Sequence, residues 1–214
     1  MDASSGRTDT LAGGGGSGSE DGASSSGKFL FPSDAFASGD SVYVLDAGNR
    51  GVRRVSLSGG AVTTVAGAGG GSYDSGGYAD GAAASARFMP AGGLLVDGSD
   101  VLVADAGNAC VRRVRDGMVS TIAGTGAFGA RDGGVASARL ALPTGIERLG
   151  AGEWLVVDGG ASTLRRLSAN DAPPPDEGPG DGGGARGCGC GSGGGTAMLA
   201  LLALLGLGRA LRRR

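Results

Sequence analysis

The chain has 214 residues, of which 48 are glycine and only 4% are aromatic, so it carries little large apolar surface for its length. Its 19 basic and 21 acidic residues nearly balance and are scattered, which argues against a basic face for nucleic acid. Histidine is absent, which removes the commonest general base and the commonest metal ligand. We therefore expect a protein that is not an enzyme and holds no cofactor.

One stretch of sequence recurs along the chain. Residues 44–55 return nearly unchanged at 103–114 and more loosely at 157–167. Each copy has an apolar run, a polar turn with Asp and Gly, and a second apolar run, a pattern that predicts a β-hairpin. The period is between 50 and 60 residues, and a period of about this size with several short strands per unit is typical of propeller blades.

Other short patterns recur with the same period. The quartet Thr-x-Ala-Gly is followed each time by a glycine-rich loop with an Asp-Gly pair, then by a basic residue, an apolar residue and a proline. The quartets are residues 10–13, 64–67 and 121–124, and the Asp-Gly pairs are residues 21–22, 80–81 and 132–133.

The hydrophobic pattern predicts four antiparallel strands in a complete unit, joined by turns such as Asp116-Gly117 that tolerate positive φ. Four such strands make one propeller blade. In the third unit the pattern ends after three strands. The expected strands are residues 34–38, 42–45, 52–57 and 61–66; then 92–96, 101–104, 110–115 and 118–123; then 144–149, 154–157 and 163–167.

The turn Asp-Ala-Gly-Asn followed by Val-Arg-Arg-Val, together with the Thr-x-Ala-Gly and Asp-Gly elements, resembles the NHL repeat family over about residues 10–167. The third unit departs from it, since Asp158-Gly159-Gly160-Ala161 lacks the asparagine. The resemblance implies an all-β fold, a partial β-propeller of about three four-stranded antiparallel blades, with a short C-terminal hydrophobic helix. The expected parts are a disordered residues 1–7, blades at about 14–67, 68–124 and 125–168, and an orphan outer strand at residues 8–13.

Three blades leave two exposed sheet edges, whereas propellers of this kind close into rings of roughly six blades. Closure is expected either from N-terminal blades upstream of this sequence or from a homodimer that completes the ring. The orphan strand favours some form of closure, because it resembles the fourth strand of a blade and can pair with residues 163–167 of its own ring or of a partner chain.

Asp46, Asp105 and Asp158 occupy equivalent positions and are candidates to bind Ca²⁺ as a set of carboxylates. The favoured interpretation is turn chemistry, in which each Asp side chain caps the backbone amides that follow it. Each hairpin also carries an arginine pair, and neighbouring strand residues point to opposite faces. One arginine of each pair is therefore expected to meet an aspartate and the other to face solvent. The pairs are Arg53-Arg54, Arg112-Arg113 and Arg165-Arg166.

The sequence predicts a Pro/Gly-rich linker over residues 169–195, with Cys188 and Cys190, and a hydrophobic helix over residues 196–214 that ends in an arginine cluster. We expect this helix to insert into a membrane. The alternatives are a tail anchor that is not processed and an amphipathic helix that docks on the blades. Metal binding by the two cysteines is disfavoured. The expected membrane residues are Ala197, Met198, Leu199, Leu201, Leu202, Leu204, Leu205 and Leu207, and the expected cytoplasmic anchor is Arg209, Arg212, Arg213 and Arg214.

This tail resembles the C-terminal sorting signal of myxobacterial surface proteins. The resemblance implies a sorting protease, lipidation at Cys188 or Cys190, and export to the outer surface of the cell envelope. Residues 1–7 show no secretory signal, so we expect the natural beginning to lie upstream.

The expected function is non-enzymatic binding or scaffolding at the cell surface, with a protein or glycan as partner. Two alternatives stay open. One is a fragment of a propeller enzyme whose catalytic residues lie in N-terminal blades, and the other is a structural adhesion component of the envelope.

Overall fold

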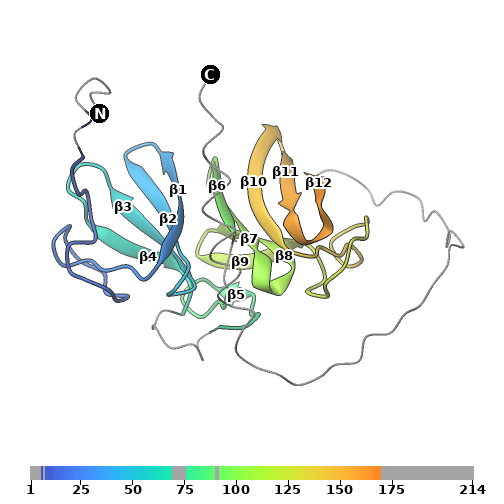
Figure 1. Ribbon diagram of the computed structural model, residues 1–214, viewed down its shortest axis with the longest axis horizontal. Coiled ribbons are helices and arrows are strands. Elements are labelled where there is room, and N and C mark those ends of the chain that lie inside the picture. Colours follow the sequence, from blue (N-terminus) through green and yellow to red (C-terminus); the bar gives the residue numbers. More distant parts are fainter. Residues whose placement is uncertain (1–5, 7, 69–75, 90–91, 170–214) are drawn as a thin grey trace, which may run out of the picture. The chain divides into compact units, whose positions relative to one another are not determined.

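The computed structural model describes residues 6, 8–68, 76–89 and 92–169, and within these ranges the protein is all-β. Its strands form three separate antiparallel sheets that follow one another along the chain (Figure 1). Each sheet is one blade, as the repeat predicts. The described residues contain no α-helix, and their only helical elements are single 3₁₀ turns.

The first blade is a four-stranded meander in which neighbours in sequence are neighbours in the sheet. Apolar and polar residues alternate along its strands, and Tyr43 lies opposite Arg54 in the register that the hairpin requires. The strands are β1 (Pro32–Ser38), β2 (Ser41–Asp46), β3 (Gly51–Ser56) and β4 (Val62–Ala66).

The second blade repeats this meander and adds a fifth strand that the sequence did not predict. The short β5 (Gly81–Ala82) precedes the blade in sequence and pairs with its outer strand, Gly81 facing Val119. In the first blade an isolated bridge between Gly22 and Val62 occupies the equivalent place. The meander strands are β6 (Gly93–Asp97), β7 (Asp100–Asp105), β8 (Cys110–Arg115) and β9 (Met118–Ala123).

The third blade has three strands in the described residues: β10 (Pro143–Gly150), β11 (Glu153–Asp158) and β12 (Thr163–Ser168). The outer edge of β12 therefore carries no strand there, as expected from the sequence.

The expectation of an outer strand at residues 8–13 is not met in this structure, where the segment forms no strand. A strand exists only when another strand pairs with it, and this segment instead lies on the first blade. Thr10, Leu11 and Ala12 line a cavity of about 270 Å³ together with apolar side chains of that blade. These are Phe29, Pro32, Val42, Val44 and Val55.

The hairpin turns use left-handed backbone conformations. Asp116 and Gly117 both have positive φ, 50° and 73°, as a two-residue type I′ turn requires. The turns after β2, β7 and β11 each end on a non-glycine residue in the left-handed region, with φ between 50° and 54°. These residues are Arg50, Ala109 and Ser162.

The core lies between neighbouring blades. We call the two faces of a blade leading, toward the preceding blade in sequence, and trailing, toward the next. The trailing face of the first blade packs on the leading face of the second, and the second packs on the third in the same way. The first contact joins Leu45 and Val52 to Phe88, Val101, Val103 and Val114, and the second joins Leu95, Leu102 and Val111 to Ile146, Trp154 and Val156.

Glycine allows the inner strands of adjacent blades to approach closely. A Cβ at Gly92 would lie 2.5 Å from Cα of Thr144, and one at Gly93 would lie 3.0 Å from Cα of Gly145. No other residue fits at Gly92 without moving the backbone. The high glycine content is therefore partly a packing requirement of these blades.

The linker and tail, with Cys188, Cys190 and the proposed membrane and arginine residues, lie outside the described residues. Within the described part of the chain, no helix has the length and apolar character needed to cross a membrane.

Candidate functional site

The aspartate that ends β2 is the centre of a buried polar cluster. Asp46 is fully buried, and its Oδ1 accepts a hydrogen bond from the backbone N–H of Leu30 at 2.8 Å. Its Oδ2 accepts from Nδ2 of Asn49 at 2.7 Å and from Nη1 of Arg53 at 2.9 Å. Both carboxylate oxygens are therefore occupied by N–H donors of the same unit.

The buried guanidinium of Arg53 joins this aspartate to the loop that precedes the blade. Its Nη1 also donates to the carbonyl of Lys28 at 2.9 Å, and its Nη2 donates to the carbonyl of Glu20 at 3.1 Å and to Oδ1 of Asp21 at 2.7 Å. Asp21 in turn accepts the backbone N–H of Thr64 in β4 at 2.9 Å. We call such a set of two aspartates and one arginine a clamp.

The second clamp repeats the first almost atom for atom. Arg112 is fully buried, and it donates to Asp105 Oδ2 at 3.1 Å and, through Nε, to Asp80 Oδ1 at 2.9 Å. The other oxygen of Asp80 accepts the backbone N–H of Thr121 at 3.0 Å. The Tyr78 ring lies over the guanidinium, with its centroid 4.8 Å from the guanidinium carbon, which adds cation–π attraction.

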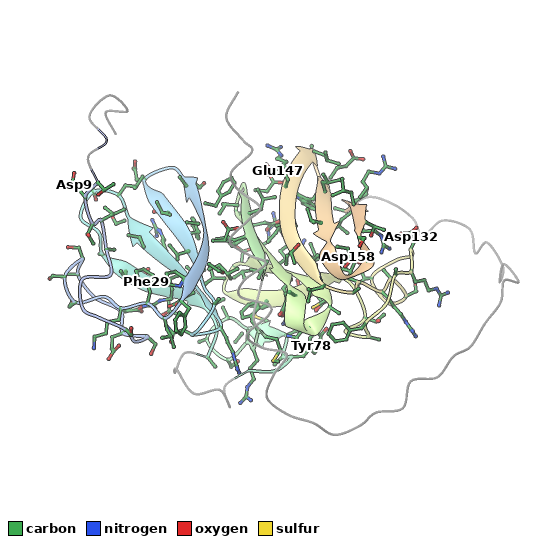
Figure 2. All side chains as sticks on the ribbon, viewed as in Figure 1. Asp9, Phe29, Tyr78, Asp132, Glu147 and Asp158 are labelled. Carbon is green, nitrogen blue, oxygen red and sulfur yellow. The ribbon has the colours of Figure 1, made fainter. Side chains whose placement is uncertain are left out.

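The third clamp is incomplete. Arg165 contacts Asp132, and its Nη1 lies 3.6 Å from Oδ2 of Asp158, longer than the matching contacts of the other two clamps. Asp132 is 91% exposed, whereas Asp21 and Asp80 are 48% and 38% exposed. In the first two blades the outer strand covers this aspartate and donates an N–H to it. Figure 2 shows Asp132 at the margin of the third sheet, with Asp158 further inward.

The clamps bear on the two interpretations of the aspartate set. Asp46, Asp105 and Asp158 belong to three different clamps, and their oxygens accept N–H donors. Within the described residues, no cluster of three or more acidic or cysteine side chains could hold a metal ion. The cap interpretation needs correction, because the backbone amides bonded lie up to 17 residues earlier in the chain, not after the aspartate.

The arginine pairs divide as predicted in the first and third blades but not fully in the second. The first arginine of each pair meets aspartates, and Arg54 and Arg166 are exposed, whereas Arg113 is half-buried. Alternation along a strand explains this division, since adjacent side chains point to opposite faces.

The second aspartate of each clamp was missed as an arginine partner. Asp21, Asp80 and Asp132 were recognised only as loop residues. Their separation from the clamp arginine, 32, 32 and 33 positions, is the sequence signal that marks them.

Burial shifts the protonation of two groups in the second blade. Burial raises the pKa of Asp105 to about 6, although hydrogen bonds from Asn108 and the charge of Arg112 oppose the rise. Burial, with the nearby charge of Asp105, raises the pKa of the Cys110 thiol to about 12. Cys110 is therefore a protonated, unreactive core side chain.

Asp21 shows the opposite shift. Burial acts to raise its pKa, but the hydrogen bond from the Thr64 amide and the contact with Arg53 outweigh this, so the pKa is lowered.

The connecting loops, rather than the clamps, offer surface for a ligand. Phe31 and Phe128 lie on two of these loops, and their side chains are 67% and 61% exposed. Phe31 also has a φ of 50°, in a left-handed region that bulky residues rarely adopt. The opposite ends of the blades, at the β3–β4, β8–β9 and β10–β11 turns, expose Leu57, Met118 and Leu149.

The comparisons with known proteins give structural neighbours only: no family model and no curated protein matches the chain. A protein of unknown function from Bacteroides thetaiotaomicron matches with a TM-score of 0.54 and 23% identity over 60% of this chain and 32% of its own. An auxiliary nutrient binding protein from the same organism matches with a TM-score of 0.52 and 20% identity over 60% and 35%.

A third neighbour from this organism, named as a proposed phosphatase, has a TM-score of 0.52 and 24% identity over 63% of this chain and 34% of its own. This chain thus spans about a third of the length of each neighbour. At these identities the likeness supports the all-β fold alone.

The complete clamps of the first two blades should contribute more to the free energy of unfolding than the incomplete clamp of the third. We expect Arg112→Met to lower the free energy of unfolding by about 3–5 kcal/mol, because it leaves buried Asp105 without its counter-charge. Arg165→Met is the matched comparison and should cost clearly less, because Arg165 lies 3.6 Å from buried Asp158 and its other partner, Asp132, is exposed to solvent. Urea denaturation measures both; equal losses would contradict this account of the clamps.

The raised pKa of Asp105 predicts a pH dependence with a definite sign. Between about pH 4 and about pH 6 the folded state holds a proton that the unfolded state has lost, so this carboxyl contributes less stability as pH rises through that window. Relative to Asp105→Asn, the wild-type chain should lose on the order of 3 kcal/mol across it. Urea unfolding at several pH values tests this. Asp21→Asn is the control of opposite sign. Because the pKa of Asp21 is lowered in the folded state, this carboxyl stabilises the fold fully above its unfolded-state pKa and loses that contribution as pH falls.

Proposed function

We propose that this chain is a non-enzymatic binding or scaffold protein with NHL-type blades, displayed at the outer surface of the cell envelope for a protein or glycan partner. One observation carries the proposal. The recurring aspartates and arginines of the first two blades bond to each other in internal clamps, such as Asp46 with Arg53 and Asp105 with Arg112. Exposed aromatic side chains, in contrast, lie on the connecting loops.

The neighbours support this proposal at a coarse level. One is named an auxiliary nutrient binding protein, as is another from Bacteroides ovatus. The neighbour named as a proposed phosphatase keeps the enzyme alternative open. Against that alternative, this chain has no histidine and its cysteine at position 110 is buried and protonated. A structural adhesion component of the envelope is the remaining alternative.

The proposed contact surface is built around Phe31 and Phe128. Exposed aromatic rings desolvate readily, lose little side-chain entropy on binding, and are enriched at the centres of interfaces. Both rings lie on connecting loops, where binding residues are commonly placed on a rigid scaffold.

The proposed location follows from the tail. A sorting protease would cleave near Cys188 and Cys190, and one of these cysteines would become the lipidated, anchored end. The hydrophobic residues before the arginine cluster would be the transient membrane segment.

The binding surface makes a first prediction. The full chain should bind at least one member of a defined panel of oligosaccharides or displayed peptides, and Phe31→Ala with Phe128→Ala should weaken that binding about tenfold or more. Leu57→Ala with Met118→Ala, at the opposite ends of the blades, is the control and should bind normally. An unaffected Phe double variant would refute the surface. Turnover of p-nitrophenyl phosphate by the wild-type chain would favour the enzyme alternative.

The tail makes a second prediction. Mature protein from the envelope fraction should lack the C-terminal segment, so the mass of its polypeptide should be below the 20.5 kDa of the full chain. It should also carry a lipid on a cysteine. Intact mass spectrometry measures both. Cys188→Ala with Cys190→Ala should abolish the lipid without altering the clamps. A mature protein that still ends at Arg214 would defeat the sorting proposal.

A further inference from the structure

The outer edge of the third blade is shaped to receive one more strand. In the first blade the outer strand β4 makes three hydrogen bonds to the preceding loop. Val62 exchanges two backbone hydrogen bonds with Gly22, at 2.7 and 3.0 Å, and Thr64 donates its N–H to Asp21. In the second blade Val119 pairs with Gly81, and Thr121 donates to Asp80. Blade three has the matching pair Asp132-Gly133 beside β12, but no strand there in the described residues.

A segment of the chain itself carries the sequence that this edge needs. Residues 10–13 are Thr-Leu-Ala-Gly, and the two strands held by Asp21 and Asp80 end in Thr-Val-Ala-Gly and Thr-Ile-Ala-Gly. In the register of β3 with β4, Thr8 would face Leu167 and Asp9 would face Arg166. The pairing is thus complementary in charge at Asp9 and Arg166.

In this structure the segment lies on the leading face of its own first blade, where it lines the cavity with Phe29, Val42 and Val44. In the second blade the equivalents Phe88, Val101 and Val103 are buried against a trailing face. The leading face of blade one is therefore of the type that a trailing face covers.

A trailing face without a neighbour exists at the other end of the described structure. On the third blade Leu164 and Val157 are 66% and 39% exposed. Their equivalents in the second blade, Val111 and Ala104, are fully buried. The two end faces are thus the complementary halves of the contact that the protein makes twice internally.

We propose that two copies of this chain associate head to tail, each giving residues 8–13 as the outer strand of the other's third blade. Thr10 of one copy donates its backbone N–H to Asp132 of the other, and the leading face of one blade one packs on the trailing face of the other blade three. Such a head-to-tail contact closes into a pair only if it turns each copy through half a circle, which three blades of a six-blade ring would supply.

Disulfide trapping tests the strand exchange in the full chain. In the proposed register, Thr8→Cys and Leu167→Cys lie opposite each other as Val62 and Val55 do. Val62 and Val55 are a non-hydrogen-bonded pair, because the N–H and C=O of Val62 bond to Gly22 on the other side. The Cα atoms of such a pair are close enough for a disulfide. Mixing a tagged Thr8→Cys chain with a Leu167→Cys chain under mild oxidation should give a mixed dimer. Asp9→Cys is the matched control one residue out of register, and it should not cross-link to Leu167→Cys.

Sedimentation equilibrium gives an independent measurement. The wild-type chain should reach twice its mass of 20.5 kDa in the micromolar range. Thr10→Pro removes the N–H that Asp132 would accept and should weaken the dimer about tenfold or more, while Thr10→Ala keeps it.

Three results would overturn the proposal: a monomer at all concentrations; equal cross-linking by the Asp9→Cys control; or a dimer whose stability does not change in Thr10→Pro. A ladder of larger species would overturn the closed pair.

Discussion

The buried guanidinium between two carboxylates is the interaction on which the described structure depends. Each blade is a thin antiparallel sheet, and the loop that precedes the second or third blade places one large apolar side chain, Phe88 or Leu140, in the core. The arginine fixes that loop by donating to its backbone carbonyls and its aspartate, while the strand aspartate, Asp46 in the first blade, accepts a hydrogen bond from the loop's backbone N–H. Removing the arginine would leave a buried charge without a partner, which is far more costly than the net gain from the pair.

The clamp also explains how a chain so poor in aromatic residues builds a core. The polar contacts of the clamp add to the one large apolar side chain of each loop, and the other apolar core residues lie mainly on the two faces of each sheet. There, valine, leucine and alanine pack between neighbouring blades, and glycine allows the inner strands of the second and third blades to approach. Each blade is stabilised mainly by its neighbour, as in other repeat architectures.

This division of labour shapes the functional proposal. Charged residues that recur at equivalent places look like a site when read from sequence, yet in the structure Asp46 and Asp105 face inward and have no capacity left for a ligand. The surface that remains for recognition is on the loops, where Phe31 and Phe128 are exposed. The third clamp points to a partner strand. Its Asp132 is exposed, whereas the equivalent Asp21 and Asp80 each accept a backbone N–H from the outer strand of their own blade.

The sequence by itself determined the repeat, the strands to within about two residues, the Asp-Gly turns and the three-stranded third blade, because these depend on local periodicity and turn chemistry. It also indicated that one arginine of each pair would meet an aspartate. Only the tertiary structure decided that Asp21 and Asp80 are the second partners, that β5 joins the second sheet, and that residues 8–13 lie on the first blade instead of forming a strand. Those outcomes join residues about 30 or more positions apart or depend on which edge is within reach, and local pattern carries no information about either.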